Sequence, residues 1–452
     1  MSLGFLFDGF RDFAEKDALV WRDRAFSYAD LSASVERWRG FLAEKGLPRG
    51  SVTALEADFS PSAAALLLAL VESGAIVVPL TESVRPKKSE FLETAEVEAV
   101  IEIDAEDRAS FSLTGRKARH PLIMTLKDQG HPGVVLFSSG STGASKAAIH
   151  DFLPLLDKFR VRRMAKRTIS FLLFDHIGGL NTLLYTLSNG GCLVTVSDRS
   201  PEAVAAAIER FRVEVLPTSP TFLNLLLLSE AGLRHDLSSL TLVTYGTEVM
   251  PETTLSRIRE LLPAVRLQQT YGLSEIGIMR SKSRSSDSLW VKIGGEGFET
   301  RVVNGLLEIK ARSAMLGYLN AESPFTEDGW LKTGDAVLVD GEYMRILGRK
   351  TDIINVGGMK VYAADVEGQL QAMEGVEDAA VTGIPNAITG QMVSARVKLS
   401  TAETLPEFRK RMRAFLKDRV PAHHIPQKVE LIDKNLHSGR FKKMRRVVNE
   451  EE

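Results

Sequence analysis

The segment VVLFSSGSTGASKAAIH, residues 134–150, leads from an apolar run typical of a buried strand into a loop of small hydroxyl-bearing residues and glycines. The glycines allow backbone N–H groups to turn toward one point, and the single lysine adds a mobile positive charge. Such a loop is suited to a polyphosphate, although an ordinary Ser/Gly surface loop is the alternative. A Walker A loop is excluded because Ser145, not glycine, precedes the lysine and Ala147 follows it. The expected phosphate-binding residues are Ser138, Ser139, Gly140, Ser141, Thr142, Gly143 and Lys146.

The bulk properties are those of a globular protein with more than one domain. A chain of 452 residues exceeds a single compact core. A net charge of -1 gives no general attraction to nucleic acid or membrane. The single cysteine, Cys192, excludes a disulfide within the chain and a cysteine-based zinc site. With no apolar run near the roughly 18 residues of a membrane span and no signal-peptide pattern, we expect a cytoplasmic protein.

Most of the chain alternates short β-type runs with helical patterns. This alternation predicts an α/β fold, with a large N-terminal domain of mostly parallel sheets flanked by helices. Ser200 and Pro201 are typical of a helix N-cap and first turn. The clearest stretch contains predicted helices at 202–211, 221–229 and 251–262 and predicted strands at 213–216, 240–245 and 265–269.

The character of the chain changes near Leu347, where a stretch rich in Gly, Arg, Lys and Asp begins. The patterns that follow are a helix, two strands, a basic helix and a strand, which predict a small α+β domain. We therefore expect domains at 1–348 and 349–452, with a hinge at 349–352. The basic run at 158–167 is expected to form a solvated helix face.

Six segments, in order, resemble the adenylate-forming (AMP-binding) enzymes: acyl-CoA synthetases, peptide-synthetase adenylation domains and luciferases. The resemblance covers nearly the whole chain and is greatest to compact acyl- and aryl-CoA ligases. The segments are SSGSTGASK (138–146), FDHIGGL (174–180), YGTE (245–248), TYGLSE (270–275), DGWLKTGD (328–335) and GRKTDIINVGGMKVYAADVE (348–367).

The resemblance implies an ATP-dependent acid–thiol ligase with a mobile C-terminal domain. A carboxylate would attack ATP to give acyl-AMP and pyrophosphate, and coenzyme A would then accept the acyl group. ATP, Mg²⁺ and CoA are the implied cofactors. Two alternatives remain: an enzyme that loads the phosphopantetheine of a separate carrier protein, and a nucleotide- or acyl-adenylate-binding homologue without turnover.

The same resemblance implies roles for the TYGLSE and YGTE residues. Glu275 would hold Mg²⁺, and the Ser274 hydroxyl would donate to the α-phosphate. Tyr271 would stack on adenine, and its neighbours Thr270 and Gly272 would belong to the same nucleotide-binding turn. The edge of the adenine would be lined by Gly246, Thr247 and Glu248.

Asp335 is implied to accept hydrogen bonds from the ribose hydroxyls, and Arg349 to bind ribose or phosphate. His176 resembles the catalytic histidine of the acyl pocket, although a helix-core histidine is the structural alternative. Asp175 mimics the aspartate with which amino-acid-activating domains bind an α-amino group. The HIGGL pattern fits acyl-CoA synthetases better.

The C-terminal catalytic lysine of the family is less plainly matched. An ungapped alignment assigns it to Lys442, with Phe441 in place of the usual glycine and Leu436 in place of a frequent proline. A gapped alignment would put Arg440 there instead. We prefer Lys442, because an ammonium is a compact donor, and expect Arg440, Lys443 and Arg446 to belong to a solvated basic tail.

Overall fold

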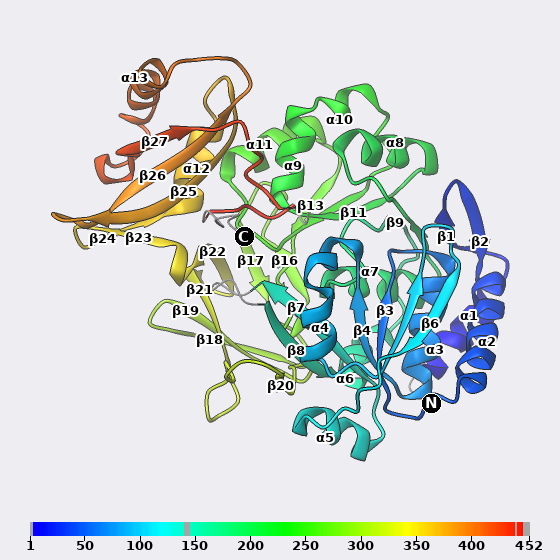
Figure 1. The fold of residues 1–452 in the computed structure, drawn as a ribbon. Helices are drawn as coiled ribbons and strands as arrows, with labels where there is room; N and C mark the ends of the chain where they lie inside the picture. Colours follow the sequence, from blue (N-terminus) through cyan, green and yellow to red (C-terminus); the bar gives the residue numbers. More distant parts are fainter. Residues whose placement is uncertain (1–2, 140–144, 439–440, 446–452) are drawn as a thin grey trace.

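The computed structural model describes residues 3–139, 145–438 and 441–445. It has a large N-terminal domain and a small C-terminal domain, and Figure 1 shows the chain passing from one to the other after strand β22 (Tyr343–Arg349). The predicted α/β architecture is confirmed.

The phosphate-loop segment belongs to the first sheet of the large domain. Of the described strands, seven form this sheet in the order β20-β8-β7-β4-β3-β5-β6, with β7, β4, β3 and β5 parallel. Successive side chains of a strand point to opposite faces, so a strand covered on both faces is apolar throughout. In β7, Val134 and Leu136 enter one core while Val135 and Phe137 enter another. The bounds are β3 (Val52–Glu56), β4 (Ile76–Leu80), β5 (Ala99–Ile103), β6 (Ala109–Leu113), β7 (Gly133–Ser139), β8 (Ser145–Asp151) and β20 (Gly317–Tyr318).

The second sheet carries the other predicted nucleotide-binding loops. Its described strands run in the order β13-β12-β11-β9-β10-β1-β2, and all neighbours are parallel except β1 and β2. The bounds are β1 (Asp17–Trp21), β2 (Arg24–Ser27), β9 (Arg167–Ile169), β10 (Cys192–Val194), β11 (Val215–Thr218), β12 (Leu242–Tyr245) and β13 (Arg266–Gln269).

Helices fill the space between the two sheets and cover their outer faces. α2 (Tyr28–Glu44), α3 (Pro61–Ser73) and α7 (Ile177–Ser188) share one core with residues of both sheets. The second sheet is covered on its other face by α8 (Pro201–Phe211), α9 (Pro220–Leu228) and α11 (Glu252–Leu261). The Ser200 side chain caps α8 by accepting from the Ala203 N–H, as the sequence predicted. The remaining helices of this domain are α1 (Gly4–Asp12), α4 (Lys88–Thr94), α5 (Pro121–Gln129), α6 (Phe152–Leu156) and α10 (Ala231–Arg234).

A third sheet, which the sequence patterns did not predict, follows the parallel sheets. Its six described strands are all antiparallel, in the order β16-β17-β22-β21-β19-β18. A short hairpin, β14 (Gly272–Leu273) with β15 (Gly277–Ile278), leads into it. The other bounds are β16 (Ser281–Ser283), β17 (Trp290–Ile293), β18 (Phe298–Val303), β19 (Leu306–Ala311) and β21 (Leu331–Asp340).

The small domain has its own core, formed by residues between Ile354 and Val429. Its sheet has the order β24-β23-β26-β25, with β27 added beside β26. No helix in the described part of the chain is long and apolar enough to cross a membrane. The bounds are β23 (Ile353–Val356), β24 (Met359–Tyr362), α12 (Ala363–Gln371), β25 (Val376–Asn386), β26 (Gly390–Leu399), α13 (Leu405–Leu416) and β27 (Lys428–Leu431).

The basic run at 158–167 is not the predicted solvated helix face. It begins within a short 3₁₀ helix at Asp157–Phe159 and continues as exposed coil over 160–165. Lys158 departs from the expectation most: its ammonium donates to the Ile278 carbonyl at 2.9 Å, and burial lowers its pKa to about 7.

Two glycines give contrasting tests of the packing. A Cβ at Gly179 would lie 1.9 Å from the Leu173 carbonyl oxygen. A Cβ at Gly40, on the exposed face of α2 and away from its ends, would meet no atom within 4 Å. We expect Gly179→Ala to lower the free energy of unfolding by about 3 kcal/mol. Gly40→Ala should raise it by roughly 1 kcal/mol, because alanine favours the helix. Urea denaturation measures both; equal effects would contradict the packing of α7.

Candidate active site

The β7–β8 hairpin is linked to Glu275 through a tyrosine. Ser138 and Lys146 are partners across the hairpin, as are Ser139 and Ser145. The Lys146 ammonium lies 5.1 Å from the centre of the Tyr318 ring, and the Tyr318 hydroxyl donates to the Glu275 carboxylate at 2.5 Å. Gly140, Ser141, Thr142 and Gly143 lie outside the described residues. The base of the predicted phosphate loop therefore lies beside the predicted metal ligand.

The β14–β15 turn, which carries Ser274 and Glu275, is held through its backbone carbonyls. Donors from other parts of the domain reach four carbonyls of this short segment. The pairs are His150 Nε2 with Ser274 at 2.6 Å, the Met315 N–H with Glu275 at 2.7 Å, the Ser313 hydroxyl with Ile276 at 2.7 Å and Lys158 Nζ with Ile278 at 2.9 Å. These bonds hold the backbone of the turn and leave the side chains of Ser274 and Glu275, the two predicted site residues, outside the carbonyl contacts.

The His150 ring is fully buried and uncharged in this arrangement. A carbonyl oxygen only accepts, so Nε2 must carry the proton that bonds Ser274. Burial lowers the pKa of His150, although its backbone partners and the Glu275 charge act in the opposite direction. His150 thus supports the turn as a neutral donor.

Asp335 and Arg349 form a cross-strand ion pair between β21 and β22. Their backbones are in register, and Arg349 Nε lies 2.9 Å from Asp335 Oδ1. The Tyr271 hydroxyl donates to the other carboxylate oxygen. Burial raises the pKa of Asp335, and the charge of Arg349 and the Tyr271 hydrogen bond oppose that rise; Lys442 opposes it as well, while Glu275 adds to it. Five of the predicted site residues therefore share one electrostatic environment.

The residues predicted at the adenine edge follow the carboxyl ends of the adjacent parallel strands β12 and β13. A Cβ on Gly246 would lie 2.7 Å from the Thr270 hydroxyl and 2.8 Å from its carbonyl oxygen, so only glycine fits between the two loops. Thr247 has a φ of 71°, a left-handed conformation that a β-branched residue adopts only under strain. Strain of this kind is concentrated at functional sites.

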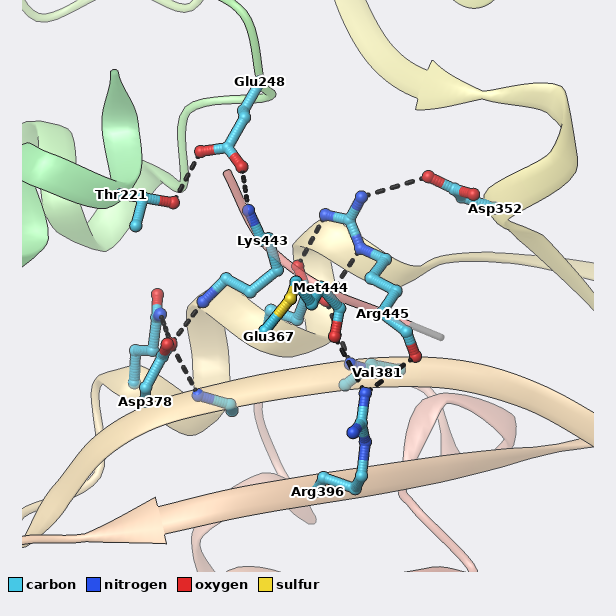
Figure 2. A network of polar contacts seen from close by, with 12 residues as sticks. Thr221, Glu248, Asp352, Glu367, Asp378, Val381, Arg396, Lys443, Met444 and Arg445 are labelled. Carbon is cyan, nitrogen blue, oxygen red and sulfur yellow. Dashed lines mark hydrogen bonds and ion pairs between the residues drawn. The ribbon is translucent and has the colours of Figure 1, made fainter. Parts of the chain in front are cut away.

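Glu248 makes contacts that the sequence did not suggest. One carboxylate oxygen accepts from the Thr221 hydroxyl at 2.5 Å, and the other accepts from the backbone N–H of Lys443 in the C-terminal tail (Figure 2). Besides its predicted place beside adenine, Glu248 therefore holds the tail against the large domain.

His176 has a structural role in addition to its predicted catalytic one. It is the N-cap of α7, and its Nδ1 accepts from the Gly178 N–H at 3.1 Å. The preceding Asp175 is buried, and its carboxylate accepts from the Thr81 hydroxyl at 3.0 Å. Both side chains thus help to fix the start of α7.

The C-terminal tail packs across both domains and contains Lys442. Lys443 is not solvated as predicted: its side chain is 9% exposed and forms an ion pair with Asp378 of β25. Arg445 pairs with Glu367 of α12 at 2.7 Å and with Asp352 at 3.0 Å (Figure 2). Arg440 and Arg446 lie outside the described residues.

Sequence reasoning missed the residues that support the site rather than form it. Tyr318 lies on a two-residue strand between two recognisable motifs, and His150 closes an apolar strand. Thr221 contacts Glu248, and Asp378 pairs with Lys443, each across a long stretch of the chain. No local pattern marks such long-range partners, although the polar His150 at the end of an apolar run was a visible signal.

The chain belongs to the AMP-binding enzyme family. Residues 7–303 match the AMP-binding enzyme family, and residues 365–442 match the C-terminal domain of AMP-binding enzymes. The predicted family is thereby confirmed, and the relatives that this chain resembles include CoA ligases.

Among curated relatives, a 3-[(3aS,4S,7aS)-7a-methyl-1,5-dioxo-octahydro-1H-inden-4-yl]propanoyl:CoA ligase of Rhodococcus jostii is 28% identical over 70% of this chain, and the match spans 64% of that relative. Indoleacetate–CoA ligase of Aromatoleum aromaticum is 25% identical over 92% of this chain and 91% of its own. An anthranilate CoA ligase in complex with anthranoyl-AMP shares the fold with a TM-score of 0.82, at 21% identity, over 98% of this chain and 95% of that one.

The buried imidazole of His150 predicts a pH dependence of stability. Its folded pKa lies below the roughly 6.5 of an unfolded chain, so the unfolded state takes up the proton first as the pH falls. Stability is therefore present above that pH and is lost on acidification, by at most about 1.4 kcal/mol per pH unit. His150→Gln keeps a donor without the titration, and urea denaturation at a series of pH values should show a shallower acid loss.

His235 provides a control of opposite sign. Glu209 and Glu202 raise its pKa, so its stabilisation is present at low pH and is lost as the pH rises through the folded value. His235→Gln should therefore change the slope only above about pH 6.5, where it removes a loss of stability on raising the pH, and not in the range below it in which His150 titrates. Equal slopes in the wild type and His150→Gln would show that His150 is not the titrating group.

Proposed function

We propose that this protein is an ATP-dependent acid–thiol ligase. It converts a carboxylic acid and ATP to acyl-AMP and pyrophosphate, and then transfers the acyl group to CoA. The observation that carries the proposal is the set of groups around the buried Asp335: Arg349 pairs with it at 2.9 Å and the Tyr271 hydroxyl donates to it, while the charges of Glu275 and Lys442 act on its pKa in opposite directions. In this proposal, the domain at 1–348 binds ATP and the acid, and the domain at 349–452 is mobile.

The chemistry requires an anion to approach a polyanion, so catalysis depends on positioning and charge neutralisation. Lys146, Arg349 and Lys442 supply positive charge from three separate elements. Asp335 accepts the ribose hydroxyls, because each of its carboxylate oxygens retains acceptor capacity beside Arg349 and Tyr271. Lys442 donates to the oxygen between carbonyl and phosphorus, where charge develops.

The donor set fits Mg²⁺ bound together with a nucleotide. Glu275 is a hard oxygen donor, and no cluster of three or more His, Cys, Asp or Glu side chains suited to a metal occurs among the residues that the structure describes. Mg²⁺ typically uses one or two carboxylates, waters and substrate phosphates rather than an all-protein cage. When bound, the ion would neutralise phosphate charge, and the Tyr318 hydroxyl orients the carboxylate that holds it.

CoA is proposed as the acceptor of the acyl group because the names of the relatives describe CoA ligases. The catalytic residues of the proposal are Lys442, His176, Ser274 and Glu275, with His176 beside the incoming carboxylate. A reducing compartment, the cytoplasm, is the proposed location, because the only cysteine is the buried Cys192.

Lys442→Ala provides the direct test. We expect ATP–pyrophosphate exchange, measured with a panel of carboxylic acids, to fall by at least about a hundredfold, because a donor to the developing charge is lost. Thioester formation from supplied acyl-AMP and CoA should be largely unchanged. Lys410→Ala, on the exposed face of α13, is the matched control.

Three outcomes would revise the proposal. If Arg440→Ala removes exchange and Lys442→Ala does not, the catalytic residue is Arg440. Exchange without a CoA thioester would identify a carrier-protein phosphopantetheine as the acceptor. Binding of ATP with no exchange for any acid would favour a binding protein without turnover.

A further inference from the structure

Phe441, the residue before Lys442, has an unusual backbone and a defined ring site. Its φ is 51°, in the left-handed region that glycine favours. A bulky residue remains in that conformation only when its surroundings compensate for the strain. The compensation here comes from the large domain.

The Phe441 ring packs into an aromatic cluster at the end of the second sheet. Its centre lies 5.1 Å from that of Phe171 and 5.7 Å from that of Phe222, the latter edge to face. The His437 ring stacks on it from the same tail, at 5.8 Å. Phe171 and Phe222 are almost completely buried core residues, so the ring occupies a prepared apolar site.

Backbone contacts on both sides of Lys442 reinforce this docking. The Ser219 hydroxyl donates to the Phe441 carbonyl at 3.0 Å, and the Lys443 N–H donates to Glu248. Within the tail, the Phe441 N–H donates to the Ser438 carbonyl at 2.9 Å, and the Ser438 N–H donates to the Lys442 carbonyl at 2.9 Å. The ring is the apolar anchor among these polar contacts.

We propose that Phe441 is a positioning residue for adenylation: its ring seats the tail on the large domain and so delivers Lys442 to the reacting phosphate. The inference rests on the proposed function. The ring must leave Phe171 and Phe222 before the small domain can rotate for the thiol step. Loss of the ring therefore affects the first half-reaction and leaves the second unimpaired.

The test compares Phe441→Gly with Phe441→Leu in the full-length protein. Glycine suits the left-handed backbone but lacks the anchor, whereas leucine keeps an apolar side chain. We expect Phe441→Gly to lower kcat for ATP–pyrophosphate exchange roughly ten- to a hundredfold, because Lys442 is misplaced. Leucine should recover most of that loss. The affinity for Mg·ATP, measured by calorimetry, and thioester formation from the synthetic adenylate of an exchanging acid should stay near the wild-type values.

A second measurement does not depend on activity. Trypsin cleaves after Lys and Arg, and the backbone on both sides of Lys442 is held on the large domain by the Ser219 hydroxyl at the Phe441 carbonyl and by Glu248 at the Lys443 N–H. Phe441→Gly should speed cleavage after Lys442, followed by mass spectrometry, while Phe441→Leu should not. An inactive wild type whose tail is protected in this way would contradict the proposed function and still support the anchor.

Two results would overturn the inference. One is wild-type exchange and wild-type tryptic protection in Phe441→Gly. The other is an equal loss of Mg·ATP affinity and of both half-reactions, which would indicate that the ring only stabilises the fold.

Discussion

The ion pair between Asp335 and Arg349 is the constraint on which the site and the domain arrangement both depend. It joins neighbouring strands at the point where β22 gives way to the connection into the small domain. A buried carboxylate is tolerated only when it is paired and hydrogen-bonded, and here Arg349 and Tyr271 provide that partnership. The same pair therefore fixes a predicted nucleotide ligand and the base of the predicted hinge.

The backbone of the β14–β15 turn is held by side chains that take no part in the proposed chemistry. His150, Ser313 and Lys158 bond carbonyls of the turn that carries Ser274 and Glu275. Removing such a donor would leave a carbonyl without its partner and allow the turn to move. Electrostatic catalysis depends on groups that are already in place before charge develops. These supporting bonds keep the backbone of the turn in place.

The sequence predicted the architecture well where local signals are strong. Apolar runs, a Ser-Pro cap and strand–helix alternation marked the parallel sheets and the start of α8. The antiparallel sheet was missed even though two of its strand pairs, β18 with β19 and β21 with β22, are hairpins with two-residue loops at 304–305 and 341–342. Its other pairs join strands that are farther apart in the chain, such as β17 with β22. Ordered motifs indicated the family, but they did not show that Glu248 would bind the tail, because that contact depends on the two domains meeting. They also did not show that Lys443 would pair with Asp378, which lies 65 residues away in the chain.

The tail is attached to the large domain through the Phe441 ring and to the small domain through buried ion pairs. It is joined to the small domain by the ion pairs of Lys443 with Asp378 and Arg445 with Glu367, whose carboxylate side chains are 7% and 3% exposed. Dissolved salt screens exposed charges strongly but buried ones much less. Raising the ionic strength would thus weaken surface pairs such as Arg11 with Asp8 while leaving the tail fastened to its own domain. In the proposed rotation of the small domain, the tail would therefore move together with that domain even at high ionic strength.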